Sequence, residues 1–457
     1  MNVLLINPQN TGYYYKLGAF YPPLGMAYIS SYLKKHGHNV KMVDMNAERF
    51  NYKDFDYSQF ELVGISTDTV RFPLVVDISR YVKKCNVPLV LGGPHAAADY
   101  ERILRDNIAD YVVFGEGEIP TCQLASELEK GNRYPELDGL AYSKDGSIVS
   151  KKQDFIKDLD NLPFPDRDGL PLNNYKSRFD KNPATSIITS RGCPFNCEFC
   201  SASQFMGMRW RKRSNESVLE EIKLLVKKYG YKSIIFFDDN FTLDPKRAID
   251  ISEKILKNDL KISWWAFSRA DEVVYNEEML EALSRAGCKM LFIGFENIND
   301  EILEEFNKKL SASIASSVVE KLKKFNIDTF ASFIMGGLKD TKDNVVKNMK
   351  FAKKLGAEIV QFSILTPYPG TRLFTKLKDK LFKKSYEYYD GTHLVFQHPN
   401  FNSSQLRRLF MRAYYYIYTE PKKLFKRGLP FFWRMVTSTT KNKIRYPLEV
   451  YPDIKQS

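Results

Sequence analysis

The sequence has few cysteines and no long apolar run. Its 457 residues include six cysteines, and three of these fall in one short segment, which is not the pattern of a disulfide framework. Thiols that serve as metal ligands need reducing conditions, so we expect a cytoplasmic protein. No stretch approaches the ~18 consecutive apolar residues of a membrane span, and Met1–Pro8 lacks the charged start of a signal peptide. These absences exclude a disulfide-rich secreted scaffold and favour a soluble or at most peripheral protein.

Basic residues are in excess, and they are unevenly placed. The formal net charge is +13, and residues 401–457 carry 12 Lys and Arg against 3 Asp and Glu. Aromatic residues are interleaved with these charges, and Ser403–Thr419 has apolar residues at helical spacing. We expect residues 381–457 to form a basic, aromatic helical cap over the mouth of the barrel that residues 184–380 are expected to form. Contact with an anionic membrane surface is the second interpretation, and contact with nucleic acid is the third.

One dense motif carries metal chemistry. Cys193, Cys197 and Cys200 lie within eight residues, close enough for all three thiolates to reach one metal cluster. An electron-carrying [4Fe–4S] cluster uses four cysteine ligands, so three ligands leave one iron open for a small molecule. A zinc site is the alternative, but it needs a fourth ligand, and the sequence has no Cys or His between Cys200 and Cys288.

The cysteine motif, with Phe199 before its last cysteine, resembles the signature of the radical S-adenosylmethionine (SAM) enzymes. The resemblance implies that the open iron binds the amino and carboxylate groups of SAM. It also implies that an electron from the cluster cleaves SAM into methionine and a 5′-deoxyadenosyl radical.

The first 140 residues alternate short apolar runs with amphipathic segments. The predicted strands are Val3–Asn7, Val40–Asp44, Leu62–Ser66, Pro88–Gly92 and Tyr111–Phe114, and the predicted helices are Leu24–His36, Phe72–Lys84, Ala98–Asn107 and Ile119–Lys130. This order predicts a doubly wound parallel sheet, which binds ligands at the carboxyl ends of its strands. The candidate contact residues in those loops are Thr67, Gly92, Gly93, Gly115, Glu116 and Gly117.

Several segments of this part, including Tyr21–Tyr28, Leu91–His95 and Asp110–Glu118, resemble the cobalamin-binding domain that precedes many radical SAM cores. Many cobalamin domains carry Asp-x-His-x-x-Gly after the first strand, and that His ligates cobalt. Here the loop reads Asn7-Pro8-Gln9-Asn10-Thr11-Gly12. The resemblance therefore implies cobalamin without a protein histidine on the cobalt. His95 is a weak candidate ligand and is better explained as a packing residue.

Residues 184–380 contain six strand-like runs separated by amphipathic helices. The runs are Ser186–Thr189, Ser233–Phe237, Ser263–Phe267, Met290–Phe295, Thr329–Met335 and Ile359–Leu365. Six such units predict a partial (β/α)6 barrel with its site at the carboxyl ends of the strands. The 141–183 segment between the two units is rich in Pro and Gly and is predicted to be a linker strap, with a hairpin turn at Lys144–Ser147.

Polar and glycine residues follow each barrel strand. Arg269 suits a carboxylate because a guanidinium can bind it bidentately, Asp238 or Asp239 and Glu296 suit the ammonium and hydroxyl groups, and glycine suits an adenine that lies flat. These positions, with Gly336, Gly337 and Pro369, resemble the SAM-contact motifs of radical SAM cores. Arg209, Arg211, Lys212 and Arg213 follow the cysteines and either hold a substrate anion or form a solvated turn.

The resemblance implies a radical SAM enzyme that methylates an unactivated carbon, with an external flavodoxin- or ferredoxin-like reductant and a small-molecule or lipid substrate. A radical cyclase or carbon–carbon coupling enzyme is the first alternative. A tRNA methylthiotransferase is disfavoured because the N-terminal half has only Cys85 and Cys122, and a non-catalytic iron–sulfur protein is the last alternative. No acid or base can be assigned from the sequence, although Tyr368, His393 and His398 have suitable side chains.

Overall fold

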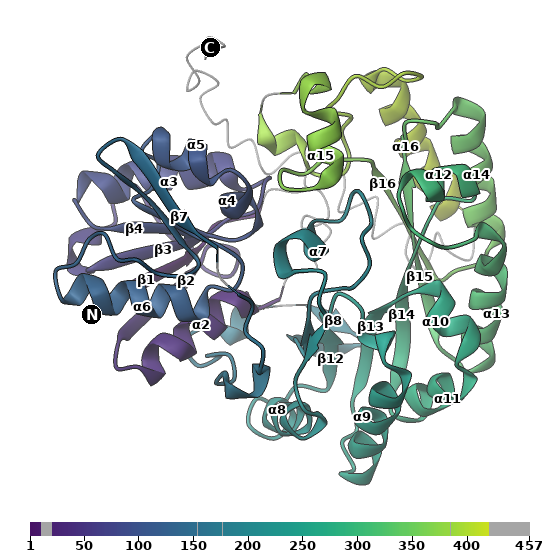
Figure 1. Cartoon of the computed structure of the whole chain (residues 1–457). Helices are drawn as coiled ribbons and strands as arrows, with labels where there is room; N and C mark the ends of the chain where they lie inside the picture. Colours follow the sequence, from purple (N-terminus) through teal and green to yellow (C-terminus); the bar gives the residue numbers. More distant parts are fainter. Residues whose placement is uncertain (11–20, 153, 176, 384, 420–457) are drawn as a thin grey trace.

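The computed structural model describes residues 1–10, 21–152, 154–175, 177–383 and 385–419. These residues form two seven-stranded sheets, which lie side by side in Figure 1.

The first sheet has the strand order β2-β1-β3-β4-β5-β6-β7. Its strands are β1 (Asn2–Asn7), β2 (Asn39–Asp44), β3 (Leu62–Ser66), β4 (Leu89–Gly92), β5 (Tyr111–Val113), β6 (Leu140–Lys144) and β7 (Ser147–Lys151). The pairings among β1 to β5 are all parallel, which confirms the predicted doubly wound sheet, and β6 and β7 add an antiparallel hairpin. Asp145 and Gly146 turn this hairpin with positive φ angles of 50° and 77°, as a type I′ turn requires.

Helices cover both faces of the first sheet. The helices are α2 (Leu24–Lys35), α3 (Phe72–Lys84), α4 (Pro94–Ala98), α5 (Tyr100–Arg105) and α6 (Glu118–Glu129). Alternate strand residues supply two separate apolar cores, one against α2 and α6 and one against α3 and α5. The predicted helix Ala98–Asn107 is wrong in detail, because Asp99 separates two short helices there. The hairpin extends the first sheet to Lys151, and the predicted limit at residue 140 stays a prediction.

The second sheet has the order β16-β15-β14-β13-β12-β9-β8. Its strands are β8 (Arg178–Phe179), β9 (Asn182–Ile187), β12 (Ser233–Phe236), β13 (Ser263–Ser268), β14 (Cys288–Glu296), β15 (Asp328–Met335) and β16 (Ile359–Ile364). All pairings but that of β8 are parallel, which confirms the partial barrel. The first barrel strand begins at Asn182, earlier than the predicted Ser186.

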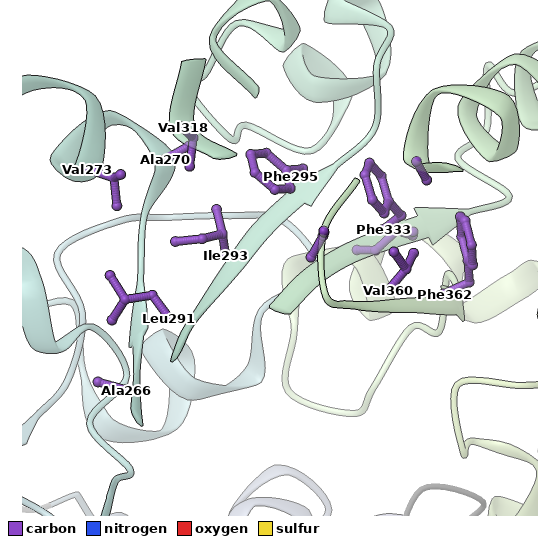
Figure 2. Close-up of a cluster of buried hydrophobic side chains, with 14 of the residues drawn as sticks. Ala266, Ala270, Val273, Leu291, Ile293, Phe295, Val318, Phe333, Val360 and Phe362 are labelled. Atoms are coloured by element: carbon purple, nitrogen blue, oxygen red, sulfur yellow. The ribbon is translucent and has the colours of Figure 1, made fainter. Parts of the chain in front are cut away.

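One face of this second sheet is packed against helices. They are α8 (Asn215–Lys227), α9 (Pro245–Lys257), α10 (Ala270–Tyr275), α11 (Glu277–Arg285), α12 (Asp300–Glu305), α13 (Ala315–Lys324) and α14 (Lys342–Lys354). Figure 2 shows strand residues such as Leu291, Ile293 and Phe333 in this core, together with Val273 and Val318 from the helices. In the part of the chain that the structure describes, no helix is long and apolar enough to cross a membrane.

The helix α16 (Ser403–Tyr418) lies along the outer edge of the barrel sheet. The Tyr414 hydroxyl accepts from the Phe362 N–H (3.1 Å) and donates to the Phe362 carbonyl (3.0 Å). Tyr418 makes the same pair of hydrogen bonds with Val360. These bonds satisfy the backbone of the edge strand β16. The predicted helix is confirmed, and it closes the edge of the sheet at β16, while the predicted cap over the barrel mouth stays a prediction. The basic tail from 420 onward lies outside the described residues.

Candidate cofactor sites

The cysteine loop leaves and re-enters the barrel through a small antiparallel ribbon. Strands β10 (Ser190–Arg191) and β11 (Arg211–Lys212) pair and so close the loop at its base. Gly192 has a positive φ of 82°, and a Cβ there would lie 2.5 Å from the carbonyl oxygen of Arg209, so only glycine fits. The helix α7 (Ser201–Met206) begins directly after the last cysteine. The motif thus sits on a closed loop with a fixed base.

Neighbouring barrel loops hold this cysteine loop in place. The Glu198 N–H donates to the carbonyl of Phe306 (3.0 Å), and the Leu373 N–H donates to the carbonyl of Glu198 (3.0 Å). The side-chain amide of Asn307 donates to the carbonyl of Asn196 (2.8 Å). Phe199 packs edge-on against Phe306 with ring centroids 5.4 Å apart. The loop is therefore positioned by backbone contacts with two other strand-end loops.

The three cysteines are free thiols and are partly or fully buried. Cys197 is buried, and Cys193 and Cys200 are half-buried. Burial raises the pKa of Cys193 to about 11, and it raises the pKa of Cys197 against the opposing charges of Lys308 and Arg269. Among the described residues, no three Cys, His, Asp or Glu side chains converge on one metal ion. A [4Fe–4S] cluster takes each thiolate on a different iron, so the set fits a cluster better than a single ion.

Lys308 also belongs to this site, although it was not among the residues predicted from the sequence. Its ammonium lies 2.8 Å from Oε1 of Glu296 and is almost fully buried. Arg269 donates to the Lys308 carbonyl (3.3 Å), and its guanidinium lies 3.6 Å from the ring centre of Phe195 in the cysteine loop. Both cations therefore lie close enough to Cys197 to act on it and can offset the negative charge of its thiolate. Lys308 follows a short helix and has no sequence signal of its own.

The two adjacent acids after β12 have different environments. The Asp238 carboxylate is fully buried and accepts from the Thr189 N–H (2.6 Å), the Ser190 hydroxyl (2.9 Å) and the Thr189 hydroxyl. Asp239 is exposed, and desolvation by the surrounding protein and the nearby charge of Asp238 raise its pKa to about 6. Only Asp239 has a carboxylate available to a ligand.

The two glycines after β15 are held by a buried acid. Gly336 and Gly337 donate their N–H groups to Asp340 (2.9 and 3.1 Å), and Nε2 of His398 lies 2.8 Å from the Gly337 carbonyl. Burial raises the pKa of Asp340 to about 7. The missing side chains also make room for Leu406, Ile302 and Phe306. These glycines therefore have a packing explanation in addition to the predicted contact with adenine.

A second site lies at the carboxyl ends of the first sheet. It is an apolar cavity with about 930 Å³ of empty volume, part of it open to solvent, and we call it the N-terminal cavity. Gly92, Gly93, Gly115 and Gly117 line it, whereas Thr67 is fully buried, donates its N–H to the Gly92 carbonyl (2.8 Å) and so shapes the turn. The predicted glycine loops do surround one cavity.

Missing side chains shape the N-terminal cavity. A Cβ on Gly92 would meet nothing within 4 Å, while a Cβ on Gly64 would lie 2.8 Å from the side chain of Leu5. A Cβ on Gly117 would lie 2.8 Å from Ile29, another wall residue. The walls can therefore approach a ligand closely and offer it an apolar surface, which fits a large cofactor with apolar groups.

His95 does not face this cavity. Its ring is fully buried between Phe72 and Tyr386, with centroids 4.2 and 4.6 Å away, and its Nδ1 lies 3.3 Å from the Thr69 hydroxyl. Burial lowers its pKa to about 3. These contacts describe a packing residue.

Buried ion pairs connect the two sites. Arg191 donates to Glu116 (2.7 Å) and Glu118 (2.6 Å), and Arg211 donates to the other oxygen of Glu116 (2.7 Å). All four side chains are buried. The Glu116 carboxylate is therefore already bound by two arginines, and the predicted contact with a cofactor would have to share it with them.

The basic run after the cysteines is mostly paired, contrary to both interpretations offered from the sequence. Arg211 is bound to Glu116, Arg213 is buried against Glu221, and Lys212 lies 2.9 Å from Asp244. Arg209 is exposed. These side chains form ion pairs within the chain, and the alternate residues Arg211 and Arg213 are buried because they point inward from the short strand β11 and the residue after it.

The remaining candidates lie at other strand ends. Pro369 lines a second hollow, between α4 and α7. His393 lies 2.9 Å from Asp390 and 2.9 Å from Arg407, and Tyr368 packs against the barrel core. None of these contacts identifies a proton donor for catalysis.

Two known families match this chain, one in each of its two parts. Residues 187–352 match the radical SAM superfamily, and residues 11–125 match the B12 binding domain. A protein of Pyrococcus horikoshii described as an uncharacterized methyltransferase is 37% identical over 93% of this chain and 94% of its own length. The anaerobic magnesium-protoporphyrin IX monomethyl ester cyclase of Rubrivivax gelatinosus is 26% identical, over 93% of this chain and 80% of its own length.

A solved structure has the same fold. The radical S-adenosylmethionine methyltransferase TsrM of Kitasatospora setae, determined with cobalamin and a [4Fe–4S] cluster bound, matches with a TM-score of 0.69 at 20% identity. The match covers 83% of this chain and 74% of that one. The chain is an enzyme with a cluster-binding and a cobalamin-binding part, and it belongs to the radical SAM superfamily, in the group that carries a B12-binding domain.

Proposed function

We propose that the protein is a cobalamin-dependent radical SAM enzyme that methylates an unactivated carbon of a small molecule. When bound, SAM supplies a 5′-deoxyadenosyl radical, and cobalamin supplies the methyl group. The protein itself must hold both cofactors and the reacting carbon in line and exclude water. The printed name of the Pyrococcus relative, a methyltransferase, supports this choice of reaction.

Specific residues would hold the cofactors. Cys193, Cys197 and Cys200 would bind the cluster, with Lys308 and Arg269 offsetting its charge. Arg269 would also orient the carboxylate of SAM, and Asp239 would accept from its ammonium group or a hydroxyl.

The backbone would complete both sites. Phe199, Gly336, Gly337 and Pro369 would shape the SAM site. Gly92, Gly93, Gly115 and Gly117 would let cobalamin approach the first sheet. We propose no histidine ligand to cobalt, because His95 is used in packing.

One observation carries this proposal: the two cofactor sites share a wall. Phe205 and Met206 of α7, directly after the cysteine loop, line the N-terminal cavity together with Arg191. A ligand in this cavity is therefore in contact with the segment that carries the cluster. Two independent binding modules would not need this shared wall.

The test is anaerobic reconstitution with iron, sulfide and hydroxocobalamin, followed by analysis of bound cofactors and SAM products. Bound cobalamin with both 5′-deoxyadenosine and S-adenosylhomocysteine formed would support radical methylation. Deoxyadenosine alone, with cobalamin bound, would favour the ring-forming alternative suggested by the name of the Rubrivivax relative. A protein that binds no cobalamin would refute the proposal.

The surroundings of the enzyme are also proposals. The electron would come from a flavodoxin- or ferredoxin-like protein in the cytoplasm. A lipid substrate, and peripheral contact with a membrane through the basic residues 420–457, follow from composition alone, since that tail lies outside the described residues.

A further inference from the structure

The inner face of the barrel sheet carries a row of aromatic rings. Phe267 pairs in register with Phe292, and Phe292 pairs with Phe330, so three rings lie side by side on three neighbouring strands. Their centroids are 4.9 and 4.8 Å apart, and the rings are tilted by 52° and 54°. Phe237 and Trp265 extend the row, at 6.1 and 5.2 Å from Phe267. We call these five residues the aromatic wall.

The aromatic wall is not part of the protein core. Its five side chains are half-buried, and in the described part of the chain none of them belongs to any of the three apolar cores. Their sequence neighbours Ala266, Leu291, Ile293 and Ala331 are buried on the opposite face, which Figure 2 shows in part. Strand alternation therefore places the wall on the inner face.

The same strands use different side chains on their two faces. The outer face has Ile, Leu, Val and Ala beside its aromatic rings. On the inner face, one row is aromatic throughout, from Phe237 just after β12 across β13 and β14 to Phe330 on β15. Aliphatic side chains fill space without preference for shape. Aromatic rings also prefer edge and offset contacts with other planar rings. The composition of the wall therefore favours a planar partner.

The wall lies close in the chain to residues of the cluster site. Asp239 and Arg269 follow Phe237 and Phe267 by two residues, just past the ends of β12 and β13, which is at most about 7 Å further along the chain. Arg269 contacts the cysteine loop through Phe195. A molecule that rests on the wall is thus within reach of the radical chemistry at the strand ends.

We infer that the aromatic wall binds a planar, apolar ring system of the substrate. This inference rests on the proposed function, because it assumes that the molecule in the barrel mouth is the one that reacts. The wall would fix the plane of the ring system and so select which of its carbons faces the cluster. Tyr21 already packs edge-on against Phe237 at one end of the wall, with ring centroids 5.3 Å apart, so a segment of the chain itself is the competing occupant of the rest.

Binding of a matched pair of probes tests this inference. We would use the reconstituted enzyme without SAM or reductant and measure affinity for 2-naphthol and for its saturated counterpart decahydro-2-naphthol by saturation-transfer NMR. The planar probe should bind more tightly. Phe292→Leu and Phe267→Leu should each weaken its binding roughly 3- to 10-fold, the typical worth of one aromatic contact. The saturated probe should respond to neither substitution.

Two further variants separate binding from folding. Phe292→Tyr keeps the ring and should keep the affinity, whereas Phe333→Leu alters the outer core and should lower the unfolding temperature without changing probe binding. Failure of both probes to bind, equal affinities for the two probes, or an unchanged affinity in Phe292→Leu would overturn the inference. Since no turnover is measured, these results are independent of whether the enzyme methylates.

Discussion

The two seven-stranded sheets of this protein build their sites in opposite ways. The first sheet is covered on both faces, and its site is a cavity made by absent side chains at Gly64, Gly92 and Gly117. The barrel sheet is packed on its outer face, and its site is made by side chains that project inward, among them Arg269 and Glu296. When both faces of a sheet are packed, a ligand can contact it only at the strand ends, where glycines leave space. When one face is unpacked, a ligand can contact the side chains along that whole face.

Removing a thiol should break the barrel site and leave the first sheet intact. We expect Cys193→Ala to lose the cluster absorption and all SAM cleavage, because an iron loses its ligand, while hydroxocobalamin still binds. All three are measured on the reconstituted protein, the cluster and bound cobalamin by absorption spectroscopy and SAM cleavage by product analysis. Cys85→Ala, at the end of α3, is the control and should keep all three properties. A Cys193→Ala protein that still cleaves SAM would contradict the assignment.

Breaking the ion pairs between the sheets should cost stability. Glu116→Gln leaves Arg191 and Arg211 buried with one carboxylate fewer, and removal of one partner from a buried pair typically costs about 3–5 kcal/mol. Urea unfolding measures this loss. Lys212→Met, which breaks the partly exposed pair with Asp244, should change the free energy of unfolding by less than about 1 kcal/mol. Equal effects of the two substitutions would show that the buried pairs do not join the sheets.

Filling the N-terminal cavity should weaken cobalamin binding and leave the cluster intact, whereas removing a thiol should do the opposite. Gly92→Leu places a side chain in the open space that cobalamin would fill, and a steric cost of about 1–3 kcal/mol corresponds to roughly 5- to 150-fold weaker cobalamin binding. Equilibrium dialysis with hydroxocobalamin measures it, and the cluster absorption should be unchanged. Gly92→Ala is the graded control with a smaller loss. Unaltered affinity in Gly92→Leu would place cobalamin elsewhere.

The smallest effect concerns the edge of the barrel sheet. Tyr414→Phe removes the hydroxyl that binds both backbone groups of Phe362, and we expect a loss of about 1 kcal/mol in the free energy of unfolding. Tyr415→Phe is the matched control, since Tyr415 is 64% exposed. If the two substitutions cost the same, the edge bonds contribute nothing to stability.

Local patterns in the sequence predicted most of the strands and the cysteine loop. Short apolar runs followed by polar residues locate β3 and β12 because strand periodicity and turn chemistry are local properties. Gly92, Gly93, Gly115 and Gly117 were likewise visible, since they lie at the end of a strand or within four residues after it. Gly64 was missed because it lies within β3, where a small residue has no signal apart from its neighbours.

Partners distant in the sequence could not be predicted. Nothing near Glu116 indicates that Arg191 and Arg211 will bind it, and nothing near Glu296 indicates Lys308. Asp238 and Asp239 are adjacent in sequence and equivalent in type, yet only the packing around Thr189 decides which carboxylate is buried. Such pairings depend on which loops come together in the fold, and residues that meet in this way have no fixed spacing in the sequence.

The phenol groups of Tyr414 and Tyr418 have a consequence for the shape of the enzyme. A partial barrel ends in a strand with free backbone groups, and such a strand invites a second molecule to add its own. The two tyrosines hydrogen-bond those groups at Phe362 and Val360, so the barrel can remain partial without exposing them to pairing with another chain. The sheet therefore ends at β16 with backbone groups of Phe362 and Val360 already hydrogen-bonded within the chain, so a strand of a second molecule has no free groups there to pair with.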